Sequence, residues 1–207
     1  MKILAFDTSN GALSIALLED KKVLQFIDIQ ENGKQAELLV TLIEEVLHHN
    51  KIWYQDIDLI ATTKGPGSFT GVRIGLSCAR ALKLATNLPL ILLDSLLIIA
   101  HKHRNHNGPI LAAIDAKMDE FFIAEFFAED GELRRLTESR LATQEEFAKI
   151  SLEHNFICGS AKNPTENVSA DLIGQIAHEE FLTKGNSSNA DPAYLRMPRI
   201  SKRKDSK

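Results

Sequence analysis

Apolar and polar residues alternate in blocks along the first quarter of the chain, and these blocks predict three strands followed by a helix. Short apolar runs at residues 2–6, 12–18 and 23–29 are separated by polar turn residues, which is typical of an antiparallel meander. In residues 35–49 the apolar side chains instead recur at helical spacing. The chain is therefore predicted to open with a β-β-β-α pattern.

The apolar side chains of the predicted helix 35–49 cover roughly half of its circumference at about 100° per residue. They are Leu38, Leu39, Leu42, Ile43, Val46 and Leu47. Covering one face of a sheet requires a narrower stripe than this. The sequence leaves two explanations open, which are deep burial within the monomer and contact with a partner protein.

A glycine-rich turn follows a predicted strand at residues 57–61 and precedes a predicted helix at residues 72–85. Its glycines include Gly65, Gly67 and Gly71, and glycine permits both positive φ and close approach of another backbone. A strand, a glycine turn and a helix N-terminus can present N–H groups to an anion. The spacing matches no standard phosphate-binding motif, however, and a tight turn into a closely packed helix explains it equally simply.

The predicted helix 72–85 carries small residues mainly on one side. Gly75, Cys78 and Ala79 lie there beside Ile74 and Leu82. Small side chains allow another helix or a sheet to come close. Taken alone, this pattern favours packing within the monomer.

The pattern of the first part starts again after residue 108, which predicts an internal duplication. Asp7 and Asp115 each follow an apolar strand and enter a turn, and Ser14 and Phe122 share the same offset of 108 residues. The predicted elements of this second part are strands at 110–114, 121–127, 133–141 and 156–158 and helices at 143–151 and 168–183. The chain is therefore predicted to form two β-β-β-α-β-α halves.

Two such halves facing each other would place an acidic residue on either side of a cleft. Asp7 and Asp115 could then hold a hydrated Mg²⁺, while Thr8, Ser9 and the hairpin amides hold phosphate oxygens. Gly65 and Gly67 would line the same nucleotide or phosphate cleft. The alternative is that each Asp only forms a turn.

Composition and charge describe an ordinary globular protein. The 207 residues are 44% hydrophobic and 25% charged, and the net charge of −4 gives no overall attraction to nucleic acid. Two cysteines do not make a disulfide framework and fit a reducing cytoplasm. No run is long enough to cross a membrane, and the basic end of the chain is expected to be solvated and to touch phosphates only weakly.

The polar stretch 101–109 marks the predicted boundary between the halves. Its three histidines alternate with Lys102 and Arg104 and have no carboxylate nearby in the sequence, so a metal site is not predicted. The predicted division is an N-terminal half at residues 1–104, a smaller half at 105–190, and a C-terminal segment with a basic tail at 191–207.

Several strings of the sequence closely resemble the bacterial TsaB (YeaZ) family. They are Ile3-Leu4-Ala5-Phe6-Asp7-Thr8-Ser9, Gln35-Ala36-Glu37-Leu38-Leu39, Gly65-Pro66-Gly67-Ser68-Phe69-Thr70-Gly71-Val72-Arg73-Ile74-Gly75, Ile114-Asp115-Ala116-Lys117-Met118 and Asp191-Pro192-Ala193-Tyr194-Leu195-Arg196. The resemblance spans almost the whole chain. One departure is Gln35, since the family usually has His there.

The resemblance implies an actin-like ATPase fold (ASKHA, ribonuclease H-like) of two duplicated halves. It also implies a role in placing threonylcarbamoyl on the N6 of the adenosine beside the anticodon of ANN-decoding tRNAs, in the cytoplasm. In this family the chain is a non-catalytic dimerisation subunit that forms a heterodimer with TsaD, with TsaE completing the complex. A homodimer can form when the chain is alone, and tRNA is met only through the complex. The implied partner interface is Leu38, Leu39, Leu42, Val46, Ile74, Gly75, Cys78, Ala79 and Leu82.

The sequence supports the non-catalytic assignment. Metal-binding relatives carry two histidines just after the strand that corresponds to residues 90–93, and Ser95 and Ile99 stand at those positions. The side chain of Ile99 cannot bind a metal. No catalytic residue, metal or required cofactor is therefore expected, although weak binding of ATP or ADP with Mg²⁺ at the complex interface fits the fold.

A stand-alone actin-like-fold ATPase or small-molecule kinase is the alternative hypothesis. It would use Asp7, Thr8 and Asp115. The short chain leaves little room for adenine-binding insertions, and Lys117, Met118 and Asp119 occupy the turn where such an enzyme has a glycine-rich phosphate hairpin.

Overall fold

The first half of the chain forms a five-stranded sheet around the predicted meander. A computed structural model describes residues 1–30 and 33–185. The strands are β1 (Lys2–Asp7), β2 (Leu13–Glu19), β3 (Lys22–Ile29), β4 (Leu59–Gly65) and β5 (Leu90–Asp94), in the order β3-β2-β1-β4-β5. β1 to β3 are antiparallel, whereas β4 and β5 run parallel to β1. This order and these directions are those of the ribonuclease H-like fold.

The second sheet repeats the plan of the first with one fewer full strand. Its strands are β6 (Gly108–Lys117), β7 (Glu120–Glu129), β8 (Glu132–Arg135), β9 (Arg140–Thr143) and β10 (Ile157–Cys158). β7 pairs with β6 on one side and with both β8 and β9 on the other, and β10 runs parallel to β6. The single third strand predicted for residues 133–141 is therefore broken into two short ones, and the predicted duplication is confirmed.

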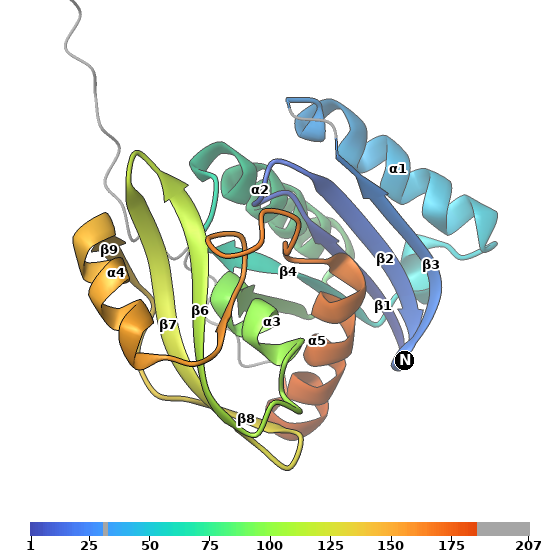
Figure 1. Ribbon diagram of the computed structural model, residues 1–207. Coiled ribbons are helices and arrows are strands. Elements are labelled where there is room, and N and C mark those ends of the chain that lie inside the picture. The colour runs from blue at the N-terminus through green and yellow to red at the C-terminus, as the bar shows by residue number, and fades with distance from the viewer. Residues whose placement is uncertain (31–32, 186–207) are drawn as a thin grey trace, which may run out of the picture.

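Within residues 1–30 and 33–185, five α-helices and the two sheets form alternating layers (Figure 1). α1 (Gln35–His49) and α2 (Phe69–Thr86) cover the outer face of the first sheet, and the short 3-10 helix η1 (Tyr54–Asp56) follows α1. α3 (Ser95–His101) and α5 (Ala170–Lys184) lie between the sheets, and α4 (Gln144–Glu153) covers the outer face of the second sheet.

The strand alternation explains why one core spans both halves. Ile3 and Ala5 of β1 point to the central layer together with Ile110 and Ala112 of β6. Helix α5 comes from the second half of the chain but packs on β1 and β2 of the first. The predicted division at residues 104 and 190 stays a prediction, and its last segment lies outside the described residues.

A contact between the halves fixes the start of α5. The backbone N–H of Ala170 donates to the buried Ser14 Oγ of β2 at 2.9 Å. The side chain of Ser169, at the cap position, makes no hydrogen bond to the start of the helix. Ser14 therefore takes over part of the capping by accepting the N–H of Ala170.

The glycine turn ends in a cap that starts α2 three residues earlier than predicted. Ser68 accepts a hydrogen bond from Gly71 N at 3.3 Å, and left-handed Asn87 ends the helix. The predicted cap of α4 is confirmed, because Thr143 and Glu146 form a capping box.

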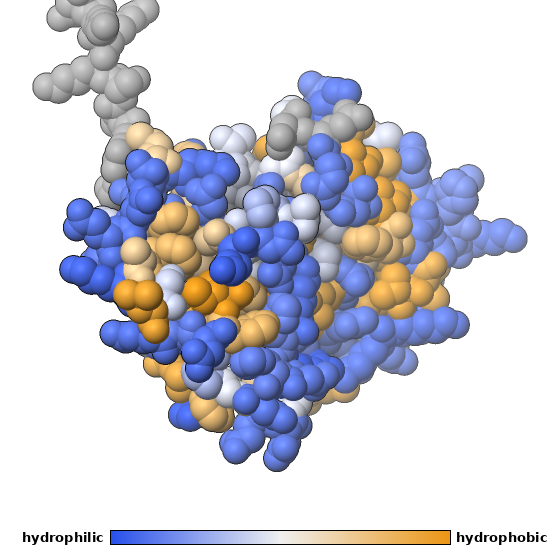
Figure 2. All heavy atoms as spheres, in the orientation of Figure 1, coloured by the Kyte–Doolittle hydropathy of each residue, from blue (hydrophilic) through white to orange (hydrophobic). Residues whose placement is uncertain are grey.

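The face turned to the viewer is mostly hydrophilic, with apolar side chains gathered over β2 and β3 and over β6 and β7 (Figure 2). None of the helices within residues 1–30 and 33–185 combines the length and the apolar character that crossing a bilayer requires.

Candidate functional site

The glycine-rich turn packs directly onto the first hairpin of the chain. The N–H of Ser68 donates to the carbonyl of Ser9 at 2.7 Å. The hydroxyl of Thr8 donates to the carbonyl of Gly71, also at 2.7 Å, and this bond is buried. The strings around residues 7–9 and 65–71 therefore form one structural unit.

Gly67 and Gly71 are needed because the two backbones touch there, and Gly75 is needed because it lies against the side chain of Thr8. A Cβ atom at Gly71 would lie 2.0 Å from the carbonyl oxygen of Thr8, and one at Gly67 would lie 2.7 Å from that of Ser9. At Gly75 it would lie 2.9 Å from the Thr8 hydroxyl oxygen. These contacts support the simpler interpretation, a tight turn into a closely packed helix.

Asp7 lies at the end of β1 and is almost completely buried. Its carboxylate accepts a hydrogen bond from Thr63 Oγ1 at 2.7 Å and one from the N–H of Ser9 at 3.1 Å. Burial raises the pKa of Asp7, and the hydrogen bonds from Thr63 and Ser9 oppose that shift. In this conformation both carboxylate oxygens are engaged by the protein.

Asp115 lies on a different kind of surface from Asp7. Asp7 shares its side of β1 with Ile3 and Ala5 and faces the central layer, as its bond to Thr63 also indicates. Asp115 pairs with Phe121, which packs in the outer cluster under α4. A shift of one residue in strand register exchanges the two faces, so an equal offset in sequence does not put the two carboxylates on opposite walls of one cleft.

The carboxylate of Asp115 is also engaged within its own hairpin. It accepts hydrogen bonds from Lys117 N at 2.7 Å and Lys117 Nζ at 2.8 Å. Partial burial favours the neutral form, but the bonds from Lys117 outweigh it and hold the pKa of Asp115 below its usual value. These contacts agree with the turn-forming role that the sequence left open.

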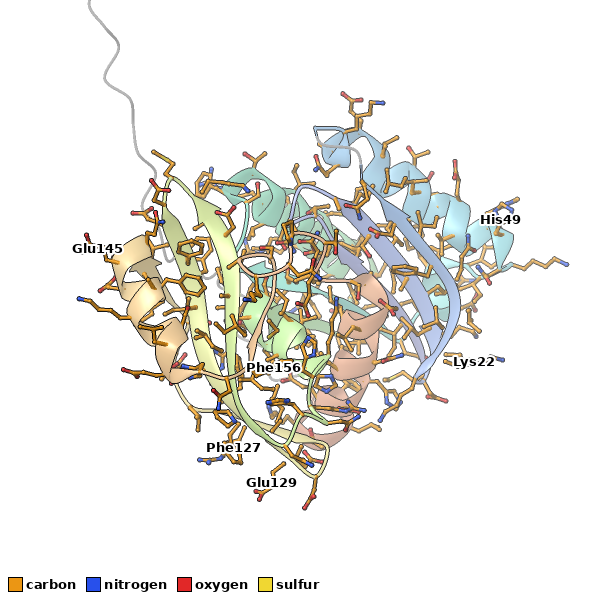
Figure 3. All side chains as sticks on the ribbon, in the orientation of Figure 1. Lys22, His49, Phe127, Glu129, Glu145 and Phe156 are labelled. Atoms are coloured by element: carbon orange, nitrogen blue, oxygen red, sulfur yellow. The ribbon has the colours of Figure 1, made fainter. Side chains whose placement is uncertain are left out.

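No group of three or more His, Cys, Asp or Glu side chains that could hold a metal ion occurs in the part of the chain that the structure describes. Ser95 and Ile99 lie buried in α3. The connector histidines have other contacts, since His101 lies 2.9 Å from Arg104 Nη1 and His106 packs on the ring of Phe156. In Figure 3 the labelled Phe156 lies beside this connector.

The two cysteines are not activated nucleophiles. Burial raises the pKa of the Cys78 thiol to about 11 and that of Cys158 to about 12. A thiol with such a pKa is almost entirely protonated at neutral pH.

The predicted interface residues divide into two groups by exposure. Leu39, Val46, Gly75 and Ala79 are buried in the core under α1 and α2, where they offer little surface to a partner. The other residues are half-buried at the edges of these helices, and they are Leu38, Leu42, Ile74, Cys78 and Leu82. The second group is the part of the prediction that remains accessible.

α1, α2 and the segment after α1 also carry large apolar side chains that are exposed. Val40 of α1 is 51% exposed, Trp53 just after α1 is 69% exposed, and Leu84 of α2 is 88% exposed. Tyr54 lies close to this region as well, since burial together with the charge of Glu44 raises its pKa. The sequence analysis did not select Trp53 or Leu84, because a single apolar residue in a loop or at a helix end has no periodic signal. We define the α1–α2 face as the half-buried side chains that pack on the cluster under α1 and α2, which are Leu38, Leu42, Tyr54, Ile74, Cys78 and Leu82.

A cleft of about 370 Å³ lies at the carboxyl ends of β4 and β5, between the halves. Asp94 occupies one wall of the cleft. Its carboxylate accepts a hydrogen bond from Ser139 Oγ at 2.7 Å and forms an ion pair with Arg135 Nη2 at 3.1 Å. The walls of the cleft also include Lys64, Glu138, Glu180 and Lys184, so the cleft is lined by both positive and negative groups. Sequence patterns could not predict this cleft, because the residues that line it come from five separate elements.

The two sheets, their strand order and the helices between them define an α/β protein of the actin-like, ribonuclease H-like class. A solved structure, YeaZ from Pseudomonas aeruginosa, has this fold, with a TM-score of 0.79 at 23% identity over 94% of this chain and 99% of that one.

Within that class the chain belongs to the family described as TsaD, tRNA N6-adenosine threonylcarbamoyltransferase, whose model matches residues 32–189. It is similar to the tRNA threonylcarbamoyladenosine biosynthesis protein TsaB of Escherichia coli, with 37% identity over 61% of this chain and 55% of that protein. The TsaB protein of Bacillus subtilis is 32% identical over 66% of this chain and 59% of its own length. The chain thus spans a little over half the length of these curated relatives, and the resemblance to the TsaB (YeaZ) family is confirmed.

Proposed function

We propose that this chain is a non-catalytic dimerisation subunit of the complex that adds a threonylcarbamoyl group to N6 of the adenosine beside the anticodon in ANN-decoding tRNAs. It docks on TsaD, which is the catalytic subunit, and TsaE completes the assembly. The chain contacts tRNA only as part of the complex. The chain requires no cofactor of its own, and it works in the cytoplasm. The names of its relatives support the pathway.

The α1–α2 face carries the proposal. The fold already buries Leu39, Ile43 and Val46 of α1 against the sheet, yet further large apolar side chains lie half-buried or exposed beside them. A protein surface that gathers such side chains is typically an interaction site. A subunit whose main task is to pair with another chain would carry such a face.

The contacts of Asp7 and Asp115 support the non-catalytic role. Both oxygens of Asp7 accept hydrogen bonds inside the protein, and Asp115 faces the outer layer. These are the residues that the alternative, a stand-alone ATPase or small kinase, would have to use. No observation specifically favours that alternative.

Co-purification with TsaD tests the proposal. Leu42→Asp places a charge in the half-buried α1–α2 face, and we expect it to weaken the complex about 100-fold, since truncating or charging a central interface residue costs about 2–4 kcal/mol. Leu152→Asp is the matched control, because Leu152 is 88% exposed on α4. Ala79 is unsuitable for this test, because it is fully buried and a larger side chain there would disturb the monomer.

A second assay addresses catalysis. We expect no threonylcarbamoyl transfer to tRNA by the isolated chain supplied with threonylcarbamoyl-AMP. Transfer without TsaD, or full TsaD binding by Leu42→Asp, would contradict the proposal.

A further inference from the structure

The cleft at the carboxyl ends of β4 and β5 is lined by six charged side chains from the part of the chain that the structure describes. They are Lys64, Asp94, Arg135, Glu138, Glu180 and Lys184. Two pairs among them compensate each other inside the protein. Asp94 Oδ1 lies 3.1 Å from Arg135 Nη2, and Glu180 Oε1 lies 3.4 Å from Lys184 Nζ. Lys64 and Glu138 are therefore the cation and the anion left over.

Neither Lys64 nor Glu138 has an ion pair or a side-chain hydrogen bond with another residue in the ranges 1–30 and 33–185. Lys64 is half-buried and Glu138 is exposed. A half-buried ammonium group has lost part of its hydration, so a negative group that enters the cleft would stabilise it. The cleft thus offers one cation and one anion to a ligand.

A bulge in β4 places Lys64 in the wall of this cleft. Thr63 pairs with Leu93 and Gly65 pairs with Asp94, so Lys64 is an extra residue with no counterpart in β5. A bulge interrupts the regular alternation of side chains along a strand and re-aims one of them. The position of Lys64 is therefore fixed by the strand, unlike that of a lysine on an open surface.

The strand β5 contributes backbone groups to the cleft. It is the last strand of the first sheet among the strands that the structure describes. The N–H of Ile60 in β4 donates to the carbonyl of Pro89, so in this parallel register alternate residues from Pro89 onward turn their peptide groups toward β4. The N–H and C=O of Leu92 therefore point away from β4, and Leu92 lines the cleft. Half-buried Leu97 adds apolar surface to the same wall.

We propose that this cleft binds a free α-amino acid with an aliphatic side chain. A ligand that carries both charges matches the uncompensated pair, with its carboxylate on the Lys64 ammonium and its ammonium on the Glu138 carboxylate. The peptide groups of Leu92 offer one further donor and one further acceptor, and Leu97 contacts the aliphatic side chain. The volume of about 370 Å³ lies near the lower end of the range of about 300–1,000 Å³ for small-molecule sites, which suits a small metabolite.

Calorimetric titration of the full chain with the common amino acids, up to about 10 mM, tests this site. We expect valine and the other aliphatic amino acids to bind more tightly than lysine or glutamate. Lys64→Met should weaken the binding of valine at least about tenfold, because a hydrogen bond between charged groups is lost at a half-buried position. Glu138→Gln should weaken it only about threefold, since an exposed ion pair contributes little.

Two modified ligands assign each charge of the amino acid to its partner. N-acetylvaline keeps only the carboxylate, and valinamide keeps only the ammonium. Lys64→Met should weaken the binding of N-acetylvaline and leave that of valinamide unchanged, and Glu138→Gln should do the reverse. Lys64→Arg keeps the positive charge and should retain most of the affinity for valine.

Control variants make the same replacements on α4, outside the cleft. Lys149→Met and Glu145→Gln change exposed side chains, so valine should bind to both variants as it binds to the unchanged chain. Circular dichroism melts verify that every variant is folded. Backbone NMR locates the bound amino acid, with shifts expected at Leu92, Asp94 and Leu97.

The amino-acid site would be overturned if no amino acid bound at the highest concentration, or if Lys64→Met bound valine as well as the unchanged chain does. NMR shifts confined to residues outside the cleft would overturn it as well. None of the residues that line the cleft belongs to the α1–α2 face. Each of these results therefore leaves the proposed binding of TsaD standing.

Discussion

The outer helical layers of the two halves occupy equivalent positions but treat their apolar side chains differently. On the second sheet, α4 places Phe147 and Ile150 against the strands and has one large apolar side chain, Leu152, exposed. On the first sheet, α1 and α2 bury a full stripe and still leave the α1–α2 face half-buried. The proposed contact with TsaD would use these additional apolar side chains of α1 and α2.

The first hairpins of the two halves also differ in their contacts and in their backbone conformation. In the first, the glycine turn sits on Thr8 and Ser9 with backbone-to-backbone contact. In the second, Lys117, Met118 and Asp119 form an open turn with three successive positive φ angles, and Met118 is exposed. The first half is thus built around fixed contacts that hold the start of α2.

The largest effect is expected at the glycine turn. Gly71→Ala would bring a methyl group to 2.0 Å from the carbonyl oxygen of Thr8, and backbone cannot yield as a side chain does. We expect a loss of at least about 3 kcal/mol in the free energy of unfolding, the upper end of overpacking costs. Urea denaturation measures it. The matched change in the other hairpin, Met118→Gly, should stabilise by about 0.5–1 kcal/mol, because glycine adopts a positive φ without the steric cost that a side chain carries there. Equal stability of both variants would contradict the contrast between the hairpins.

A substitution in α4 should lower the stability of the monomer without changing its affinity for TsaD. Phe147 of α4 stacks on Phe121 with ring centroids 4.3 Å apart. Phe147→Ala should therefore lower the free energy of unfolding by about 2–3 kcal/mol, slightly less than for a fully buried ring. Its affinity for TsaD, measured by calorimetry below the melting temperature, should not change. A loss of affinity as large as that of Leu42→Asp would remove the distinction between the two layers.

The two aspartates should respond to pH with opposite signs. The pKa of Asp7 is raised in the folded protein, so the stability it contributes is fully present below the unfolded value of 3.8 and is lost as pH rises through the folded pKa. The pKa of Asp115 is lowered, so its contribution is present above 3.8 and is lost as pH falls through the folded pKa. Carboxyl NMR titration checks both, and two pKa values on the same side of 3.8 would contradict the assignment of one buried and one exposed hairpin.

The smallest effect concerns Cys78 in the α1–α2 face. With a pKa of about 11, its thiol should react slowly with iodoacetamide at pH 8, since only about one molecule in a thousand carries the thiolate. TsaD should slow the reaction further by covering the face. Mass spectrometry follows the labelling, with Cys158 as the buried reference. Equal labelling of Cys78 with and without TsaD would argue against its place in the interface.

Local sequence patterns predicted the helices and strands well. They did not predict which face of a sheet a residue occupies or which contact covers an apolar side chain, because tertiary contacts decide both. The meander and the cap at Thr143 could be predicted because each depends on residues close together in the sequence, and the repeat could be predicted because the same pattern recurs 108 residues later. The predicted Asp7–Asp115 pairing did not follow, because strand register is set by hairpin geometry rather than by sequence offset. The interface prediction mixed Leu39 and Ala79 with Leu42 and Cys78, since periodicity marks an apolar side chain without telling which contact covers it.

Hydrogen–deuterium exchange of this chain with and without TsaD tests the central claim most directly. The account predicts slower exchange in α1, η1 and the exposed turns of α2 when TsaD is bound, with α4 unchanged. Protection of α4 with no change in α1 and α2 would contradict it.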